Sequence, residues 1–122
     1  ISFLQTAFPE FKIRHDGIDS TGNRWVHIGT DSIYFVLEQS TKKSYQKWVP
    51  YSGHAGVNHI AFEVDDIEDI RDRLLATEFI DSTIPNNHPF RKRIYFHDVE
   101  GNDWEFVQYL SDENSERNDY KL

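Results

Sequence analysis

Two segments carry the strongest fold signal in this chain: GVNHIAFEVDD, at residues 56–66, and YFHDVEGNDWEFVQ, at residues 95–108. The first stretch alternates apolar and polar side chains and ends in two aspartates, so it predicts a β-strand that leads into a capped helix. The second predicts two strands joined by a tight turn at residues 99–102. The alternation places His59 and Glu105 on the strand face that points away from the helix. An imidazole and a carboxylate on neighbouring strands can share a divalent metal.

The same kind of pattern extends outward in both directions. Toward the N-terminus we expect a helix at residues 1–8, strands at residues 10–15, 24–28 and 32–39, and a polar linker at residues 40–55. Toward the C-terminus we expect the helix to end near residue 76, a short strand at residues 79–83, strands at residues 91–97 and 103–110, and a charged irregular tail at residues 111–122. The second half is therefore a βαβββ unit, and the first half is the same unit without its first strand.

These boundaries predict one α+β domain over residues 1–122. Module 1 covers residues 1–39, the linker residues 40–55, module 2 residues 56–110 and the C-terminal tail residues 111–122. The chain has room for one core but not for a second domain. It begins at Ile1 inside an apolar helical pattern and contains no methionine, so we expect the first strand of module 1 to be absent from this chain.

Composition narrows the classes of function. The chain has 13 Lys and Arg against 21 Asp and Glu, a formal net charge of −8, which disfavours binding to nucleic acid or to an anionic membrane. No apolar run approaches the roughly 20 residues that span a bilayer. Cysteine is absent, which excludes disulfides, thiolate metal sites and a cysteine nucleophile, and fits a cytoplasmic location. No glycine-rich phosphate loop and no nucleophile elbow is present.

The segments HIAFEVDD, at residues 59–66, and YFHDVEGNDWE, at residues 95–105, resemble the vicinal oxygen chelate superfamily. That superfamily includes glyoxalase I, bleomycin-binding proteins, extradiol dioxygenases and fosfomycin-resistance thiol transferases. The resemblance is close over residues 56–109 and looser in the first half. It implies paired βαβββ modules that form a cupped mixed sheet with a metal in the cup. One fold hosts many activities, so the resemblance alone selects no reaction.

The resemblance further implies that His59 and Glu105 are the two metal ligands from module 2. The first ligand of module 1 has no counterpart, because its strand would precede residue 1. Tyr34 stands where glyoxalase I has a carboxylate, which disfavours its four-ligand chemistry and suits the three-ligand fosfomycin enzymes better. The Gly/Ser-rich cation loop of those enzymes is replaced here by NNHPF, at residues 86–90. The alternative for both expected ligands is ordinary packing: a hydrogen-bonded histidine and a carboxylate on a solvated sheet face.

Two classes of function remain open. In the first, Mn²⁺, Ni²⁺, Zn²⁺ or Fe²⁺ at His59 and Glu105 supports lyase, thiol-transferase or dioxygenase chemistry on a small oxygen-rich molecule. In the second, the protein binds and sequesters a small molecule such as an antibiotic, without metal, in an aromatic cup. The expected substrate-binding residues are Trp25, His27, Tyr34, Arg93 and Tyr95, and Arg93 would hold an anionic group. An unpaired strand edge in module 1 favours a homodimer.

Overall fold

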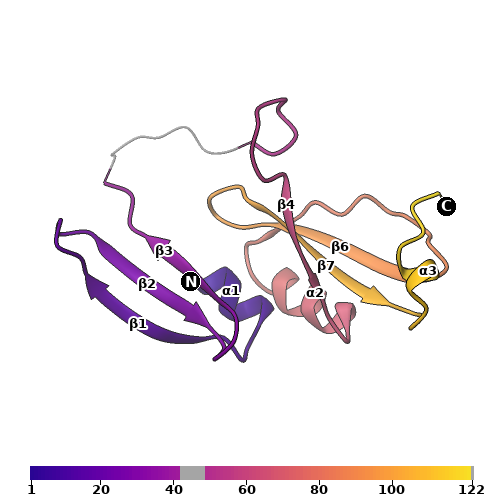
Figure 1. The fold of residues 1–122 in the computed structure, drawn as a ribbon, viewed down its shortest axis with the longest axis horizontal. Helices are drawn as coiled ribbons and strands as arrows, with labels where there is room; N and C mark the ends of the chain where they lie inside the picture. The colour runs from indigo at the N-terminus through magenta and orange to yellow at the C-terminus, as the bar shows by residue number, and fades with distance from the viewer. Residues whose placement is uncertain (42–48, 122) are drawn as a thin grey trace. The chain divides into compact units, whose positions relative to one another are not determined.

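The computed structural model describes residues 1–41 and 49–121, and the chain divides into two compact units (Figure 1). The first unit is Ile1–Gln46 and the second is Lys47–Leu122, so the boundary falls inside the expected linker. Part of that linker, residues 42–48, lies outside the described residues. No helix among the described residues is long and apolar enough to cross a membrane.

The first unit contains one short helix and a three-stranded antiparallel sheet in the order β1-β2-β3. Its elements are α1 (Ser2–Ala7), β1 (Lys12–Ile18), β2 (Arg24–Gly29) and β3 (Tyr34–Glu38). The expected alternation in β2 is confirmed, because Val26 and Ile28 are buried while Trp25 and His27 are half-buried. Phe11 stacks on Phe8 with ring centroids 4.7 Å apart. One face of this sheet is therefore buried, and the other face is accessible to solvent.

The expected strand at residues 10–15 is too short, because β1 continues to Ile18. The hairpin loop begins three residues later than expected, at Asp19. Asp16 is inside the ladder, where its carboxylate forms an ion pair with Arg24 at 2.6 Å. A register shift between Ile13 and His15 marks a bulge at Arg14, which moves His15 to the open face beside His27.

The second unit is a βαβββ module with a mixed sheet in the order β4-β7-β6-β5. Its elements are β4 (His59–Glu63), α2 (Ile67–Leu75), β5 (Ile80–Asp81), β6 (Arg91–His97), β7 (Asp103–Tyr109) and α3 (Asn114–Arg117). β4 pairs with β7 in parallel, and β6 pairs with β5 and β7 in antiparallel fashion. The expected α+β module is present, and the cup between modules stays a prediction.

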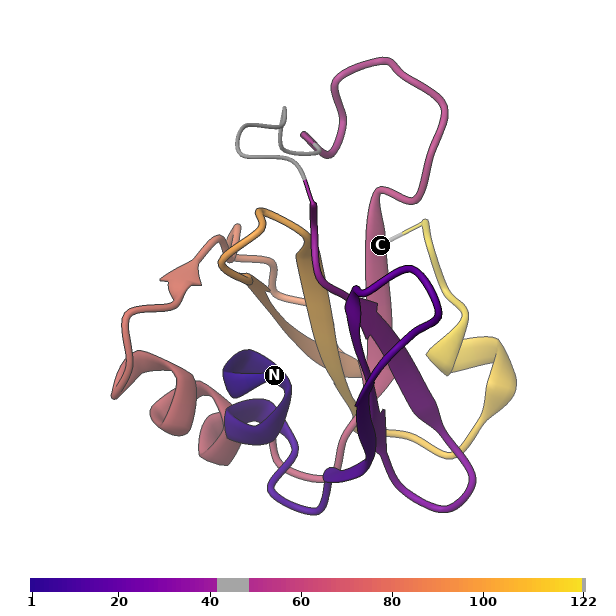
Figure 2. The same cartoon turned by 90° about the vertical axis from the view of Figure 1, so that its left-hand side faces the viewer.

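Helix α2 forms because its sequence supplies both a cap and an apolar stripe. The Asp66 carboxylate accepts hydrogen bonds from the backbone N–H groups of Glu68 and Asp69 at 3.0 and 3.2 Å. Ile67, Ile70 and Leu74 are buried, and the helix contacts β6 and β7 (Figure 2). This packing covers the sheet face that carries Phe96, Trp104 and Phe106, which are nearly inaccessible to solvent. The opposite sheet face is left for polar residues.

The two long hairpins share one loop design, D-x-x-G-N-x-W, at residues 19–25 and 98–104. In each loop the first aspartate accepts hydrogen bonds from backbone N–H groups two and four residues later. The glycines, Gly22 and Gly101, have φ values of 90° and 86°, which a residue with a side chain rarely adopts. Asp98 additionally accepts a hydrogen bond from the buried indole of Trp104 at 3.0 Å.

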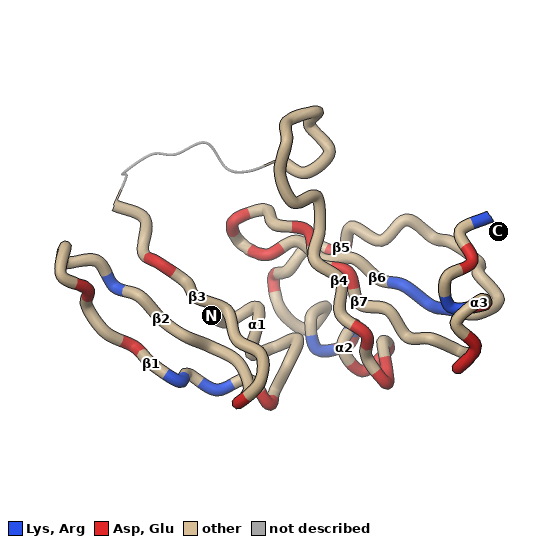
Figure 3. The backbone as a smooth tube through the Cα atoms, in the orientation of Figure 1, with Lys and Arg blue, Asp and Glu red and all other residues tan. Residues whose placement is uncertain are grey.

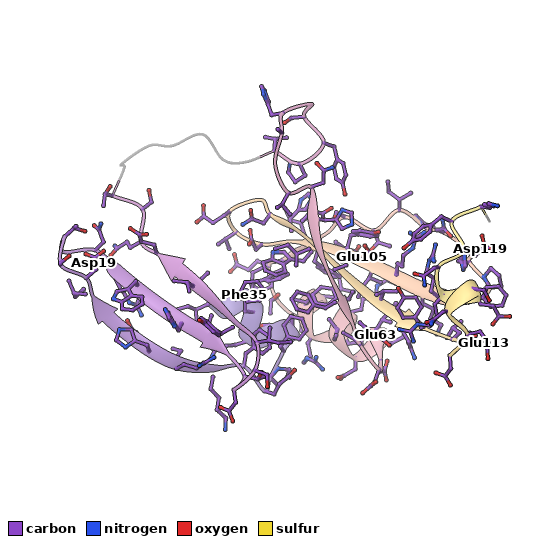
Figure 4. The ribbon with its side chains drawn as sticks, in the orientation of Figure 1. Asp19, Phe35, Glu63, Glu105, Glu113 and Asp119 are labelled. Carbon is purple, nitrogen blue, oxygen red and sulfur yellow. The ribbon has the colours of Figure 1, made fainter. Side chains whose placement is uncertain are left out.

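The C-terminal tail was expected to be irregular because of its charge. It instead forms α3 and docks on the second sheet. Buried Arg91 donates hydrogen bonds to the carbonyl oxygens of Arg117 and Asp119 at 2.7 and 2.9 Å. Arg117 in turn pairs with Glu63 at 2.6 Å and lies over the Tyr109 ring. Figure 3 shows the basic start of β6, and Figure 4 labels Glu63 on β4 and Asp119 after α3. Two arginine side chains therefore hold this segment, through hydrogen bonds to backbone carbonyl oxygens, one ion pair and contacts with aromatic rings.

Candidate functional site

The centre of the site is a direct contact between His59 on β4, at the edge of the second sheet, and Glu105 on the neighbouring parallel strand β7. Nε2 of His59 lies 3.1 Å from Oε2 of Glu105. His59 begins β4, and Glu105 lies in the middle of β7, opposite Ala61 (Figure 4). The Glu105 side chain is 11% exposed and that of His59 is 35% exposed, so the carboxylate is buried and the imidazole borders solvent. The structure thus brings together the two residues that the alternation placed on one face.

Tyr95 completes the inner part of the site from β6. It is the direct cross-strand neighbour of Glu105, and its ring lies edge-on to the His59 ring with centroids 5.9 Å apart. Burial raises the pKa of the Tyr95 phenol, and the negative charge of Glu105 and a hydrogen bond to it raise that pKa further. Tyr95 therefore keeps its proton and donates a hydrogen bond to the Glu105 carboxylate.

Asp103, which the sequence interpretation passed over, is a second buried carboxylate on the same face. It lies two residues before Glu105, and its ladder neighbours are His59 on β4 and His97 on β6. Its Oδ1 accepts a hydrogen bond from the Ser82 hydroxyl at 3.1 Å and lies 3.4 Å from Nε2 of His97. The period of two that identified Glu105 also predicts the side of Asp103. Its partners come from separate elements and have no sequence signature.

The linker contributes a further residue that sequence reasoning missed. The Tyr51 hydroxyl lies 3.0 Å from Nδ1 of His59 and 3.4 Å from Oδ2 of Asp103. The pKa of Tyr51 is raised, by burial of the hydroxyl first and by the Asp103 charge second. Tyr51 also has a positive φ of 61°, which is uncommon outside glycine. The segment expected to act only as a connection therefore reaches the polar side of the second sheet.

We name the face of the second sheet that carries His59, Tyr95, Asp103 and Glu105 the polar face. Its hydrogen bonds form one chain, from Glu105 through His59 and Tyr51 to Asp103. Every buried side-chain nitrogen or oxygen among the described residues has a hydrogen-bond partner. The carboxylates are thus compensated by neutral or cationic donors, as buried charges require.

The first unit holds a different cluster, which we name the aromatic face: His15, Trp25, His27 and Tyr34. The Trp25 ring lies 4.5 Å from that of His15 and 4.8 Å from that of His27. The rings of His27 and Tyr34 stack at 5.0 Å, and the Arg14 guanidinium lies 4.3 Å from the Tyr34 ring centroid. The sequence interpretation placed His15 at the end of a strand and assigned it no role. The bulge that turns it onto this face has no clear sequence signal.

Comparison with protein families matches residues 8–106 to the Glyoxalase/Bleomycin resistance protein/Dioxygenase superfamily. The chain belongs to this superfamily. The match covers most of both units and confirms the resemblance that the two strand motifs indicated. A comparison with curated proteins gives no match.

Solved structures of superfamily members share the fold. The genomically encoded fosfomycin resistance protein FosX from Listeria monocytogenes matches with a TM-score of 0.69 and 20% identity, over 95% of this chain and 84% of that chain. A glyoxylase/bleomycin resistance protein/dioxygenase domain from Frankia sp. EAN1pec matches with a TM-score of 0.72 and 16% identity, over 92% and 82%. A FosX mutant complexed with Mn(II) and 1S,2S-dihydroxypropylphosphonic acid matches with a TM-score of 0.64 and 17% identity, over 86% and 77%. At these identities the likeness shows the fold alone.

The geometry of the pair can be tested against the metal that this superfamily implies. Two donors at about 2.1 Å from a cation, at right angles to each other, lie about 3.0 Å apart. The 3.1 Å between Nε2 of His59 and Oε2 of Glu105 fits that spacing. Among the described residues no group of three His, Cys, Asp or Glu side chains converges on one point. The pair therefore fits a cation as two of its ligands, and waters or substrate oxygens would supply the others.

Arg93 lies on the polar face one row further along β6, opposite Val107 and two residues before Tyr95. It makes no hydrogen bond or ion pair with any residue in the ranges 1–41 and 49–121. Its half-buried guanidinium differs in this from Arg91 and Arg117, which hold the tail. Of the expected substrate-binding residues, Arg93 and Tyr95 thus share a face with the pair, while Trp25, His27 and Tyr34 share the aromatic face of the first unit.

Proposed function

We propose that this superfamily member acts on a small oxygen-rich molecule with the help of a divalent cation held by His59 and Glu105. The 3.1 Å contact between a solvent-bordering imidazole nitrogen and a buried carboxylate oxygen carries the proposal. Mn²⁺, Ni²⁺, Zn²⁺ and Fe²⁺ all accept this donor set. The cation would supply Lewis-acid polarisation of substrate oxygens.

The residues around the pair suggest how a substrate would be oriented. Tyr95 keeps its proton and holds Glu105 by a hydrogen bond, so one carboxylate oxygen stays aimed at His59. Arg93 offers a guanidinium that has no hydrogen-bond partner among the described residues, which suits an anionic group on the substrate. Lyase, thiol-transferase and dioxygenase reactions are all compatible with such an arrangement, and we propose no one of them over the others.

A second candidate function is metal-free binding on the aromatic face. His15, Trp25, His27 and Tyr34 form a continuous set of ring contacts, and Tyr34 is 47% exposed. Half-exposed aromatic rings bind planar organic molecules through dispersion and edge-to-face contacts. This function would sequester a small molecule without changing it, and it needs neither His59 nor Glu105.

We also propose a homodimer in the cytoplasm. β3 pairs with β2 and forms one edge of the first sheet, and exposed strand edges readily pair with another chain. Light scattering at micromolar concentration tests the assembly: a mass of two chains supports the proposal, and a mass of 14.4 kDa contradicts it.

Metal binding separates the two functions. Mn²⁺ titration followed by electron paramagnetic resonance would measure free and bound cation for the protein and for His59→Ala and Glu105→Gln. We expect binding by the parent protein and a loss of at least about tenfold in affinity in each variant. His27→Ala is the matched control, because it removes an imidazole from the aromatic face only. Absence of binding by the parent, with retained binding of planar aromatic molecules that is lost in His27→Ala, would favour the sequestering function.

A further inference from the structure

A second contact between a histidine and a carboxylate lies on the polar face, beside the His59–Glu105 pair. Nε2 of His97 lies 3.4 Å from Oδ1 of Asp103, and the Ser82 hydroxyl oxygen lies 3.1 Å from the same Oδ1. An imidazole, a carboxylate and a hydroxyl therefore meet at one oxygen atom. All three groups carry lone pairs that a cation accepts, and none of them belongs to the pair proposed to hold the first cation.

Three neighbouring segments of the second unit bring these side chains together. His97 ends β6 and is the direct ladder neighbour of Asp103, which begins β7. Ser82 follows β5, and its backbone N–H donates a hydrogen bond to the carbonyl oxygen of Tyr95 at 2.9 Å, which fixes it beside β6. The other carboxylate oxygen of Asp103, Oδ2, is held by the Tyr51 hydroxyl at 3.4 Å. Oδ1 is therefore the oxygen that faces His97 and Ser82.

The charge of the polar face favours a cation at this second position. Asp103 and Glu105 are 6% and 8% exposed, and two residues along a strand separate their Cα atoms by only about 6.6 Å. In the part of the chain that the structure describes, neither carboxylate forms an ion pair with Lys or Arg. Buried charges are stabilised by a charged partner or by a metal. The His97 side chain is 37% exposed, so a cation reaches Asp103 from that side.

The spacing of the ligand atoms fits a tetrahedral cation. Two ligands about 2.1 Å from a cation, at the tetrahedral angle to each other, lie about 3.4 Å apart. Nε2 of His97 and Oδ1 of Asp103 have this separation, whereas the corresponding atoms of His59 and Glu105 are 3.1 Å apart, nearer to the spacing of a right angle. Zn²⁺ prefers four ligands in a tetrahedron and accepts imidazole nitrogen and carboxylate oxygen. The His97 position therefore suits Zn²⁺.

We infer that His97, Asp103 and Ser82 form a second cation site on the polar face, which takes Zn²⁺ and a water molecule as its fourth ligand. The two positions share no ligand, so this inference does not depend on the cation proposed for His59 and Glu105. A cation at His97 would offset the charge of Asp103 next to the proposed substrate site. A histidine must be neutral to bind a metal, so Zn²⁺ competes with a proton for His97.

Calorimetric titration with Zn²⁺ at about pH 8, above the ordinary histidine pKa, counts the sites. We expect two equivalents of Zn²⁺ for the parent protein, one for His97→Ala and one for His59→Ala. Ser82→Ala should weaken the binding of one equivalent about tenfold or more and leave the other unchanged. His54→Ala removes an exposed imidazole of the same unit, so it is the matched control and should still bind two equivalents.

The variants separate the second site from the proposed function. A single equivalent that persists in His59→Ala and is lost in His97→Ala supports the second site and contradicts the proposed function. A single equivalent that persists in His97→Ala overturns the inference and leaves the proposed function standing. One equivalent lost in both variants means one shared cation and also overturns the inference.

Two further outcomes complete the test. No binding by the parent overturns the inference together with the proposed function. If circular dichroism shows that His97→Ala does not fold, Ser82→Ala decides the question. Two equivalents with unchanged affinities in Ser82→Ala, or the loss of an equivalent in the His54→Ala control, then overturn the inference.

Discussion

The aromatic face of the first unit and the polar face of the second are built on sheets of similar size, yet they carry different chemistry. On the first, His27 contacts the rings of Trp25 and Tyr34. On the second, His59 contacts a carboxylate and a tyrosine hydroxyl. The neighbours of each imidazole therefore decide its use: stacked rings favour an organic ligand, and a buried carboxylate favours a cation.

The chemistry of each exposed face depends on how the opposite face of the same sheet is covered. In the second unit, α2 packs on β6 and β7, and the residues between them are fully buried. That core holds the strands rigidly enough to place two carboxylates on the other face, where each is compensated by hydrogen bonds. Four measurements test this difference between the two faces, and they are described in order of decreasing expected effect.

The greatest loss of stability should come from the covered face of the second sheet. Phe106→Ala removes a side chain with 0% exposure and leaves a cavity, so we expect the free energy of unfolding to fall by about 3–5 kcal/mol. Trp25→Ala, on the aromatic face, should cost clearly less because that side chain is half-buried. Urea unfolding followed by circular dichroism measures both. Equal losses would show that the aromatic face is as buried as the core and would end the distinction between the faces.

The second largest difference in stability is expected between the two D-x-x-G-N-x-W loops. Asp98→Ala leaves the buried indole N–H of Trp104 without its acceptor, and we expect a loss of about 1–3 kcal/mol in the free energy of unfolding. Asp19→Ala removes the same backbone hydrogen bonds, but its other partners are exposed, so its loss should be smaller. Thermal unfolding of both variants tests the order. A larger loss for Asp19→Ala would mean that the indole contact contributes nothing.

The helices of the two units provide a smaller contrast. α2 has a side-chain cap, and α1 has none. Asp66→Ala should lower the free energy of unfolding by about 1 kcal/mol, because the N–H groups of Glu68 and Asp69 lose their acceptor. Asp65→Ala is the matched control, since it removes an adjacent charge but no cap. Similar losses in the two variants would assign the effect to charge rather than to capping.

The smallest effect is expected in the alkaline range. The pKa of Tyr95 is raised in the folded protein, so folding favours the protonated phenol. This stabilisation is fully present below the ordinary tyrosine pKa of about 10 and is lost as the pH rises toward the folded value. Tyr95→Phe should therefore lose stability less steeply above about pH 10 than the parent. A profile for Tyr95→Phe that is as steep as that of the parent would contradict this assignment.

Much of the second unit could be predicted because local rules agree there. The alternation in residues 59–63 and 103–109, the aspartate cap of α2 and the D-x-x-G-N turn each specify one conformation, and all are present. The first unit was predicted less well. A bulge at Arg14 depends on how two strands align, and alternation assumes regular pairing, so the end of β1 was misplaced and His15 was assigned no role. The charged tail was misjudged because charge indicates solvation unless partners are known.

The superfamily, the order of elements in the second module and the face that carries His59 and Glu105 could all be predicted from the amino-acid sequence alone. These follow from side-chain periodicity and turn chemistry, which act between residues close together in the chain. The folded chain was needed to show that Asp103 belongs to the hydrogen-bond network of the polar face, that the linker places Tyr51 on His59, and that Arg93 has no hydrogen-bond partner in the described part of the chain. These facts depend on contacts between residues up to 52 positions apart, which no local pattern encodes.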